Sequence, residues 1–354
     1  MAGPDAAAEE ERELAEERVE RERSVRDVRA HGRQLRNAII SLILLGALII
    51  GLLFAIPGLR GVEKALRHVD KDYVVWAIAL EILSCLGYVA VFQLVFERAP
   101  RRFAARLAWT EMAFGSALSF GGAGSLAIGA WVLSARGVPA DRIARRSAEL
   151  FMLTSAINII VLVVSGVLLA VGAVPGDHNP LLTVLPAAIA AATFVFFLFI
   201  PRWARPRSKT RPPNNRVEAI LFGFADSIDR TRHLLITPAW RLLGGYVYLL
   251  ADIAVLFVCL RAVGVETPLV PVIVAYQVGY LANIIPVPAG IGVLETGLVG
   301  MLVLFGARAT PATAGVLIYH AIALWVPTVF GTIAFLLLRR TINEPLTPRP
   351  VTTR

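Results

Sequence analysis

Several ionisable side chains lie inside long apolar stretches of this chain, where each is energetically costly. Glu81, Asp252 and Glu295 interrupt runs of aliphatic residues, and His320 follows Tyr319 inside another run. Within a lipid bilayer, such groups face the protein interior or a water-filled cavity and mark substrate or proton pathways. We therefore treat these five residues as candidates for substrate binding or translocation, with hydrogen bonding between helices as the alternative.

Two glycine-rich breaks accompany these acids. The stretch "NIIPVPAGIGVLETG" combines two prolines and three glycines with Glu295, and "SFGGAGS" interrupts an earlier apolar segment that also carries Glu111. Non-helical backbone is tolerated at membrane depth only where protein or a wet cavity satisfies its polar groups. We expect both breaks to form hairpin tips beside a substrate site. The candidate residues at these tips are Asn283, Pro286, Pro288, Gly290, Gly292, Gly121, Gly122 and Gly124.

Three of the candidate side chains have a local structural alternative. Glu295 follows the second break, so it either caps the returning half-helix or binds a cationic group or a proton. His320 either switches its charge or only bonds a neighbouring helix. Glu149 occupies the comparable place after the first break, but Arg145 and Arg146 beside it favour an ordinary ion pair.

Composition indicates the class of protein that holds these residues. The 354 residues are 56% hydrophobic, with a mean hydropathy of +0.67, which is too apolar for a soluble globule. The net charge of +9 comes from arginines in short segments between apolar runs, so we expect topology signals and no nucleic-acid partner. Cys85 and Cys259, the two cysteines, both lie in apolar runs. We expect no metal site and no cofactor.

The apolar runs predict an all-α polytopic membrane protein with about six full spans and two re-entrant helical hairpins. Each span reaches roughly the 20 residues that crossing a bilayer requires. The spans lie at about 38 to 56, 72 to 96, 143 to 173, 181 to 201, 240 to 263 and 313 to 338. Segments 103 to 136 and 268 to 305 instead break into two limbs of borderline length, and these are the predicted hairpins.

Arginine placement predicts the topology. Arginines precede the first span, flank the first hairpin, follow residue 201 and end the last span, which places both termini in the cytoplasm of an inner (plasma) membrane protein. The loop "PGLRGVEKALRHVDK" is a misfit, because an outside loop should not carry two Arg and two Lys. Arg136, Arg142 and Arg145 at the cytoplasmic mouth could attract an anionic headgroup, although the positive-inside rule explains them equally well.

Weak internal similarity at an offset near 170 divides the chain into two repeats. Glu81 matches Asp252, Pro100 matches Pro271, and the glycine-rich breaks match each other. The topology gives the two units opposite orientations, as in inverted-repeat transporters. The predicted parts are a charged arm at 1–37, a membrane domain at 38–340 and a tail at 341–354. Within the membrane domain we expect repeat one at about 72–173, an interfacial linker at 202–237 and repeat two at about 238–338.

The stretch from Ile284 to Arg340 resembles the C-terminal signature of the lysylphosphatidylglycerol synthase transmembrane region, also called the flippase-like or UPF0104 family. The stretch "FGGAGSLAIGAWVLSARGVPADRIARRSAELFMLTSAIN" is similar to its earlier signature. The resemblance implies movement of a lipid between leaflets. No soluble synthase domain follows, so we expect no lipid aminoacylation. His320 stands where relatives usually have Arg, and Ser125 and Leu126 where they often have an acid, so the relatives' substrate does not transfer.

Together these observations favour a translocase for a lipid or lipid-linked substrate, with membrane lipids, anionic or lipid-linked, as its partners. A proton-coupled transporter of a small polar solute is the second hypothesis. The third is a non-transporting membrane partner of a lipid or glycan synthase. We expect no enzyme activity, because the sequence has no nucleophile with its base, no cluster of metal ligands and no phosphate-cradling loop.

Overall fold

The structure is a computed structural model, and the helices described below lie in one unit, Gly61–Arg354. It describes residues 69–117, 123–176, 179–210, 240–281 and 293–339, together with Ile228, Thr231 and His233. The charged arm, the predicted span at 38 to 56, most of the predicted linker and the tail lie outside these residues. So do both hairpin tips. Within the described residues all regular structure is helical, as predicted.

Four described helices are long and apolar enough to cross a membrane. They are α3 (Lys71–Val95), α6 (Ala140–Ala170), α12 (Ala309–Arg339) and α9 (Leu243–Ala262), which the short helix η2 (Trp240–Leu242) precedes. Each coincides with a predicted span. The predicted span at 181 to 201 lies in α7 (Pro180–Thr210), whose apolar part, Pro180–Phe196, is shorter.

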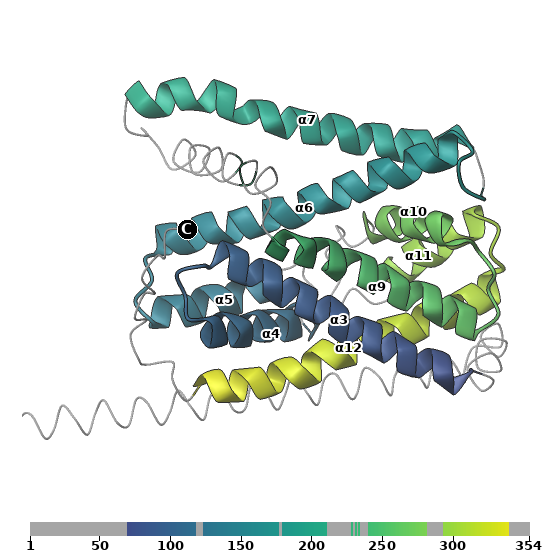
Figure 1. The fold of residues 1–354 in the computed structure, drawn as a ribbon, viewed down its shortest axis with the longest axis horizontal. Helices are drawn as coiled ribbons and strands as arrows, with labels where there is room; N and C mark the ends of the chain where they lie inside the picture. Colours follow the sequence, from purple (N-terminus) through teal and green to yellow (C-terminus); the bar gives the residue numbers. More distant parts are fainter. Residues whose placement is uncertain are drawn as a thin grey trace, which may run out of the picture. The chain divides into compact units, whose positions relative to one another are not determined.

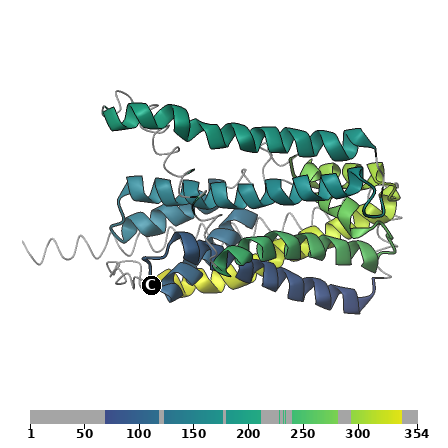
Figure 2. The same cartoon turned by 45° about the horizontal axis from the view of Figure 1, so that its top comes forward.

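Four shorter helices occupy the two predicted hairpins. They are α4 (Arg101–Ala117), α5 (Ala123–Ala135), α10 (Leu269–Tyr280) and α11 (Val293–Leu304). At 1.5 Å per residue even the longest is only about 26 Å, less than a hydrocarbon core of about 30 Å. α4 packs on α5, and α10 packs on α11. The two pairs lie toward opposite ends of the helical unit in both views (Figures 1 and 2).

Local sequence explains where these helices begin and end. A proline precedes α4, α6 and α10, a position where its missing N–H costs nothing and where it disfavours helix in the preceding residue. Gly137 follows α5 with a φ of 76°, and Gly306 follows α11 with a φ of 87°. This left-handed conformation closes a helix C-terminus at little cost only for glycine. The second helix of each short pair is therefore ended by the same device.

The long helices hold the short pairs in place across the two halves of the chain. α3 packs along α9, α4 packs on α12, and α10 packs on α6. The crossing of α3 and α9 depends on glycine: a Cβ atom on Gly87 would lie 2.6 Å from both the Gly244 carbonyl oxygen and the Tyr248 nitrogen. Close backbone approach at small residues is the usual basis of helix association in membranes.

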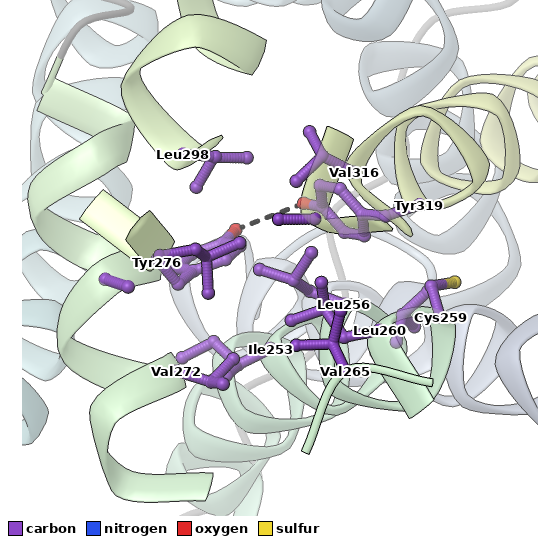
Figure 3. Packing of buried hydrophobic residues seen from close by; sticks show 14 of the residues in the cluster. Ile253, Leu256, Cys259, Leu260, Val265, Val272, Tyr276, Leu298, Val316 and Tyr319 are labelled. Atoms are coloured by element: carbon purple, nitrogen blue, oxygen red, sulfur yellow. Dashed lines mark hydrogen bonds between the residues drawn. The ribbon is translucent and has the colours of Figure 1, made fainter. Parts of the chain in front are cut away.

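Two buried hydrophobic clusters surround these contacts. One gathers residues of α9 to α12, including Ile253, Leu256, Val272, Leu298 and Val316, which Figure 3 shows interlocking. The other joins α3 to α6 through Phe92, Leu107, Leu153 and their neighbours, and Leu338 of α12 belongs to it as well. Each short pair is therefore anchored in its own core, which fixes the polar side chains that project from it.

Candidate functional site

A cavity of about 320 Å³ lies between the two halves. α3, α4 and α5 line it from the first half, and α9, α10, α11 and α12 line it from the second. Its wall is unusually polar for the interior of an apolar bundle. The acids and hydroxyl groups among its lining residues are Glu81, Glu111, Asp252, Ser84, Ser116, Ser125, Tyr88, Tyr248, Tyr280 and Tyr319.

Asp252 is fixed by tyrosines from two other helices. The Tyr276 hydroxyl of α10 donates a hydrogen bond to Asp252 Oδ2. The Tyr319 hydroxyl of α12 lies 3.2 Å from each carboxylate oxygen and 3.5 Å from the Tyr276 hydroxyl, and Figure 3 shows the two tyrosines converging. Hydrogen bonds to a charged acceptor are among the stronger ones in proteins. The carboxylate is thus held in one position on the cavity wall.

Glu81 is the matching acid on α3 and is less fully bonded. Its side chain is buried, at 5% exposure, and Cys85 Sγ lies 3.6 Å from Oε1. Its Oε2 atom has no hydrogen-bond partner among the described residues. A buried polar oxygen without a partner is costly, so this atom is well placed to accept a hydrogen bond from a molecule in the cavity.

Glu111 brings a third carboxylate to the cavity from α4. The Tyr88 hydroxyl donates to its Oε2 over 3.4 Å, and the residue is 6% exposed. Gly129 of α5 packs directly against it, because a Cβ atom on Gly129 would overlap the carboxylate. The glycine therefore lets α5 approach closely enough to cover this acid.

Glu295 and His320 form a pair at the cavity. His320 Nδ1 of α12 lies 3.2 Å from Glu295 Oε1 in the first turn of α11, and both side chains are largely buried. His320 also lines the cavity. An imidazole beside a carboxylate can accept or release a proton. The described His, Cys, Asp and Glu residues form no group of three or more suited to a metal ion.

The backbone of α12 adds a further polar group. Pro327 lies inside this helix, and both Pro327 and Ala323 line the cavity. Proline has no N–H, so the carbonyl of Ala323 loses the helical donor that residue 327 would otherwise supply. The cavity therefore combines carboxylates and hydroxyl groups with a helix segment that lacks one backbone hydrogen bond, and its carboxylates suit a ligand rich in hydrogen-bond donors.

Comparison with known proteins identifies the family. A family model described as the lysylphosphatidylglycerol synthase TM region matches residues 39–331. The chain belongs to this family. A UPF0104 membrane protein from Methanothermobacter thermautotrophicus is 37% identical over 84 residues, which cover 23% of this chain and 24% of that relative. The matched stretch thus spans about a quarter of the relative's length. With the apolar helices, family membership shows a multi-pass membrane protein.

Within this family member, the structure separates the predicted site residues into two groups. Glu81, Asp252, Tyr319 and His320 line the cavity, and Glu295 contacts His320. Gly124 lies in the first turn of α5. The other glycines, the prolines and Asn283 of the two tips lie outside the described residues. The remaining candidates line a different pocket of about 330 Å³, and they are Glu149, Arg136, Arg142 and Arg145.

Glu149 lies away from the cavity and pairs with an arginine of its own helix. Arg146 Nη1 lies 3.1 Å from Glu149 Oε2, so a cation three residues earlier on the same helix holds this acid. The local alternative, an ion pair with Arg146, is the arrangement that forms. The described residues that line the cavity do not include Glu149.

The tyrosines are the functional residues that sequence reasoning missed. Tyr88, Tyr248, Tyr276 and Tyr280 are the tyrosines at or behind the cavity wall that were not predicted. A signal was available, because tyrosine in membrane proteins concentrates at the two interfaces. Tyr88 and Tyr248 instead lie within apolar spans that already carry an acid, at spacings of seven and four residues from Glu81 and Asp252.

Proposed function

We propose that this protein translocates a lipid or lipid-linked molecule across the bacterial inner membrane, with the polar headgroup in the central cavity. The observation that carries this proposal is the acid-lined and tyrosine-lined cavity of about 320 Å³ between the two halves of an apolar bundle. This volume is at the small end of ligand sites. It suits a headgroup whose acyl chains stay in the bilayer. The family description names a lipid, which supports this class of substrate.

The chemistry of the wall narrows the headgroup. No arginine or lysine is among the described residues that line the cavity, whereas three carboxylates are. An unpaired anion buried beside these acids would be strongly disfavoured. Carboxylates and tyrosine faces instead favour a group with hydroxyl or ammonium donors. We therefore infer a headgroup that presents donors or a positive charge to Glu81, Glu111 and Asp252.

The arrangement of helices supports an inverted repeat, in which α3 to α6 correspond to α9 to α12. Under this correspondence the contact of α4 with α12 becomes the contact of α10 with α6, and both contacts are present. The contact of α3 with α9 is its own counterpart, because the correspondence exchanges these two helices. The left-handed glycines after α5 and α11 also correspond. We propose that the two short pairs are re-entrant hairpins that enter the membrane from opposite sides.

A proton-coupled transporter of a small polar solute is the second candidate. The Glu295–His320 pair favours it, because a histidine and a carboxylate 3.2 Å apart can carry a proton beside the cavity. The two candidates differ in what the cavity holds. A lipid translocase retains a specific lipid, and a solute carrier shows solute-dependent proton movement without one.

Mass spectrometry of lipids retained by the purified full chain in mild detergent tests the proposal. We expect one lipid class to be enriched in the wild type and depleted at least tenfold in Asp252→Asn, which removes a charge and keeps an acceptor oxygen. Asp72→Asn is the matched control, because Asp72 is exposed at the start of α3 and lines neither this cavity nor the pocket of about 330 Å³. Proteoliposomes that hold the enriched lipid, labelled on its headgroup, then report movement between leaflets.

Three outcomes would count against the proposal. Retention of only the bulk lipid mixture by the wild type would remove its support, and solute-driven proton uptake in the same vesicles would favour the second candidate. Equal depletion in the Asp252 and Asp72 variants would show that the cavity is not the site. Selective retention without any movement between leaflets would make the protein a lipid-binding partner and not a translocase.

A further inference from the structure

A second pocket lies at the end of the bundle where α3 stops and α6 starts, on the left in Figure 1. It has a volume of about 330 Å³ and gathers arginines from three segments of the chain. Arg98 comes from the turn after α3, Arg136 from the residue after α5, and the others from the first two turns of α6. Those α6 residues are Arg142, Arg145 and Arg146.

Acids nearby balance only part of this charge. Arg146 contacts Glu149 at 3.1 Å and Glu97 at 3.9 Å, and Arg145 contacts Asp141 at 2.7 Å on the exposed surface. Arg98 and Arg142 have no acidic partner among the described residues, so their positive charges stay available in the pocket. Helix α6 begins after Pro139, which lines the pocket. The unpaired N–H groups at the helix N-terminus add to the positive potential of the pocket. The pocket is therefore an attractive site for an anion.

An apolar groove lies next to this pocket, along α5 and α6. The groove has a volume of about 670 Å³, and Ile143 lines both it and the arginine pocket. Small side chains form its floor, including Ala130 and Ala144, while Leu126 and Phe151 border it at 50% and 61% exposure. A positive pocket beside an apolar groove matches the two chemically different ends of one molecule.

We propose that this pocket and groove bind an anionic phospholipid, with the phosphate among the arginines and an acyl chain along the groove. Arginine pairs well with phosphate oxygens, and apolar small residues leave room for a chain. A soluble phosphate compound would use the pocket and leave the groove uncovered. This site is distinct from the central cavity, whose wall is acidic, and it does not depend on any transport through that cavity.

Native mass spectrometry of the full chain in mild detergent tests this site, with dioleoyl phosphatidylglycerol and dioleoyl phosphatidylcholine offered in equal amounts. We expect the wild type to retain phosphatidylglycerol preferentially. Arg142→Gln should lower that preference roughly fivefold, which corresponds to about 1 kcal/mol for one arginine near a lipid phosphate. Arg308→Gln removes the same charge from an exposed arginine outside the pocket and should leave the preference unchanged.

The groove is tested separately from the charge. Ala144→Leu should fill the groove and reduce retention of both lipids, while Ala192→Leu on α7 adds the same bulk to an exposed position elsewhere and should not. Neither substitution alters an arginine. Thermal unfolding of each variant checks that the fold is retained, and Arg142→Lys, which keeps the charge, should keep most of the preference.

Several results would overturn the inference. An equal affinity of the wild type for the two lipids would remove the anion site. The same loss in Arg142→Gln and Arg308→Gln would mean that net charge, and not this pocket, sets the preference. If millimolar inorganic phosphate displaces phosphatidylglycerol and Ala144→Leu has no effect, the ligand is a soluble phosphate compound and the lipid assignment is wrong.

Discussion

The central cavity and the arginine pocket have nearly equal volumes, about 320 and 330 Å³, but carboxylates line the first and arginines line the second. The cavity takes its acids and tyrosines from helices of both halves. The pocket takes all of its described residues from one stretch, 95–149. Cavity acids such as Glu81 and Glu111 are almost fully buried, whereas Arg145 and its partner Asp141 are half exposed or more. The two sites therefore depend differently on tertiary packing.

This difference decides how substitutions should act at each site. In the cavity, Asp252 and Glu111 accept hydrogen bonds from tyrosines of other helices, so a change there alters stability and ligand binding together. In the pocket, the Arg145–Asp141 pair forms within one helix turn and faces solvent, where such pairs contribute little to stability. Substitution of an exposed arginine such as Arg145 should therefore alter binding alone. The predictions below test this contrast, beginning with the largest expected effect.

The crossing of α3 and α9 is the contact on which the cavity depends most. Gly87→Ala places a methyl group 2.6 Å from two backbone atoms of α9, so the helices must separate. We expect a loss of at least about 2 kcal/mol in unfolding free energy, since overpacking outweighs the helix propensity that alanine gains. Thermal unfolding in detergent measures the loss. Tyr248 lies at this crossing and also lines the cavity. Separation of the two helices should therefore reduce lipid retention as well.

Gly300→Ala is the matched control for that variant. Gly300 lies in α11, and a Cβ atom there would meet nothing within 4 Å. Alanine should therefore be neutral or stabilise the protein by up to about 1 kcal/mol. Equal unfolding temperatures for Gly87→Ala and Gly300→Ala would show that the two long helices do not need close contact, and the account of the cavity's framework would fail.

The hydroxyl of Tyr319 should have the next largest effect. Tyr319→Phe removes the donor that lies 3.2 Å from both Asp252 oxygens and changes no other atom of a side chain that is 1% exposed. We expect a loss of about 1 kcal/mol in stability and a clear reduction in lipid retention. Tyr73→Phe, at a tyrosine that is 40% exposed, should change neither. Wild-type retention in Tyr319→Phe would argue that Asp252 does not hold the headgroup.

The same contrast explains what could be predicted from the sequence. Long apolar runs predict α3, α6, α9 and α12 to within a few residues, because hydropathy and length alone decide whether a segment can cross a bilayer. The prolines and glycines likewise predict that 103 to 136 and 268 to 305 break into pairs of short helices. These features are local. The arginine pocket is less local, but all of its described residues come from 95–149, whereas the cavity lining runs from Glu81 to Pro327.

The cavity is only partly predictable because its bonds join distant residues. Charge and apolar context identify Glu81, Asp252 and His320 individually. The bonds of Asp252 to tyrosines 24 and 67 residues further along the chain depend on how three helices pack, and no spacing rule encodes that geometry. Glu149 shows the converse, because its pairing with Arg146 lies within one helix and the sequence offers that local alternative directly.

Substitution of Arg145 should have the smallest effect on stability. It distinguishes most clearly between a site that depends on its charges for folding and one that does not. The bond of Arg145 to Asp141 is exposed and lies within one helix, so Arg145→Gln should change the unfolding free energy by less than about 0.5 kcal/mol. The same variant removes a positive charge from the pocket wall and should still lower the preference for phosphatidylglycerol severalfold. Such a loss of binding without a loss of stability is the behaviour expected of a surface site. A large drop in unfolding temperature would instead mean that the pocket, like the cavity, is held together by its charges.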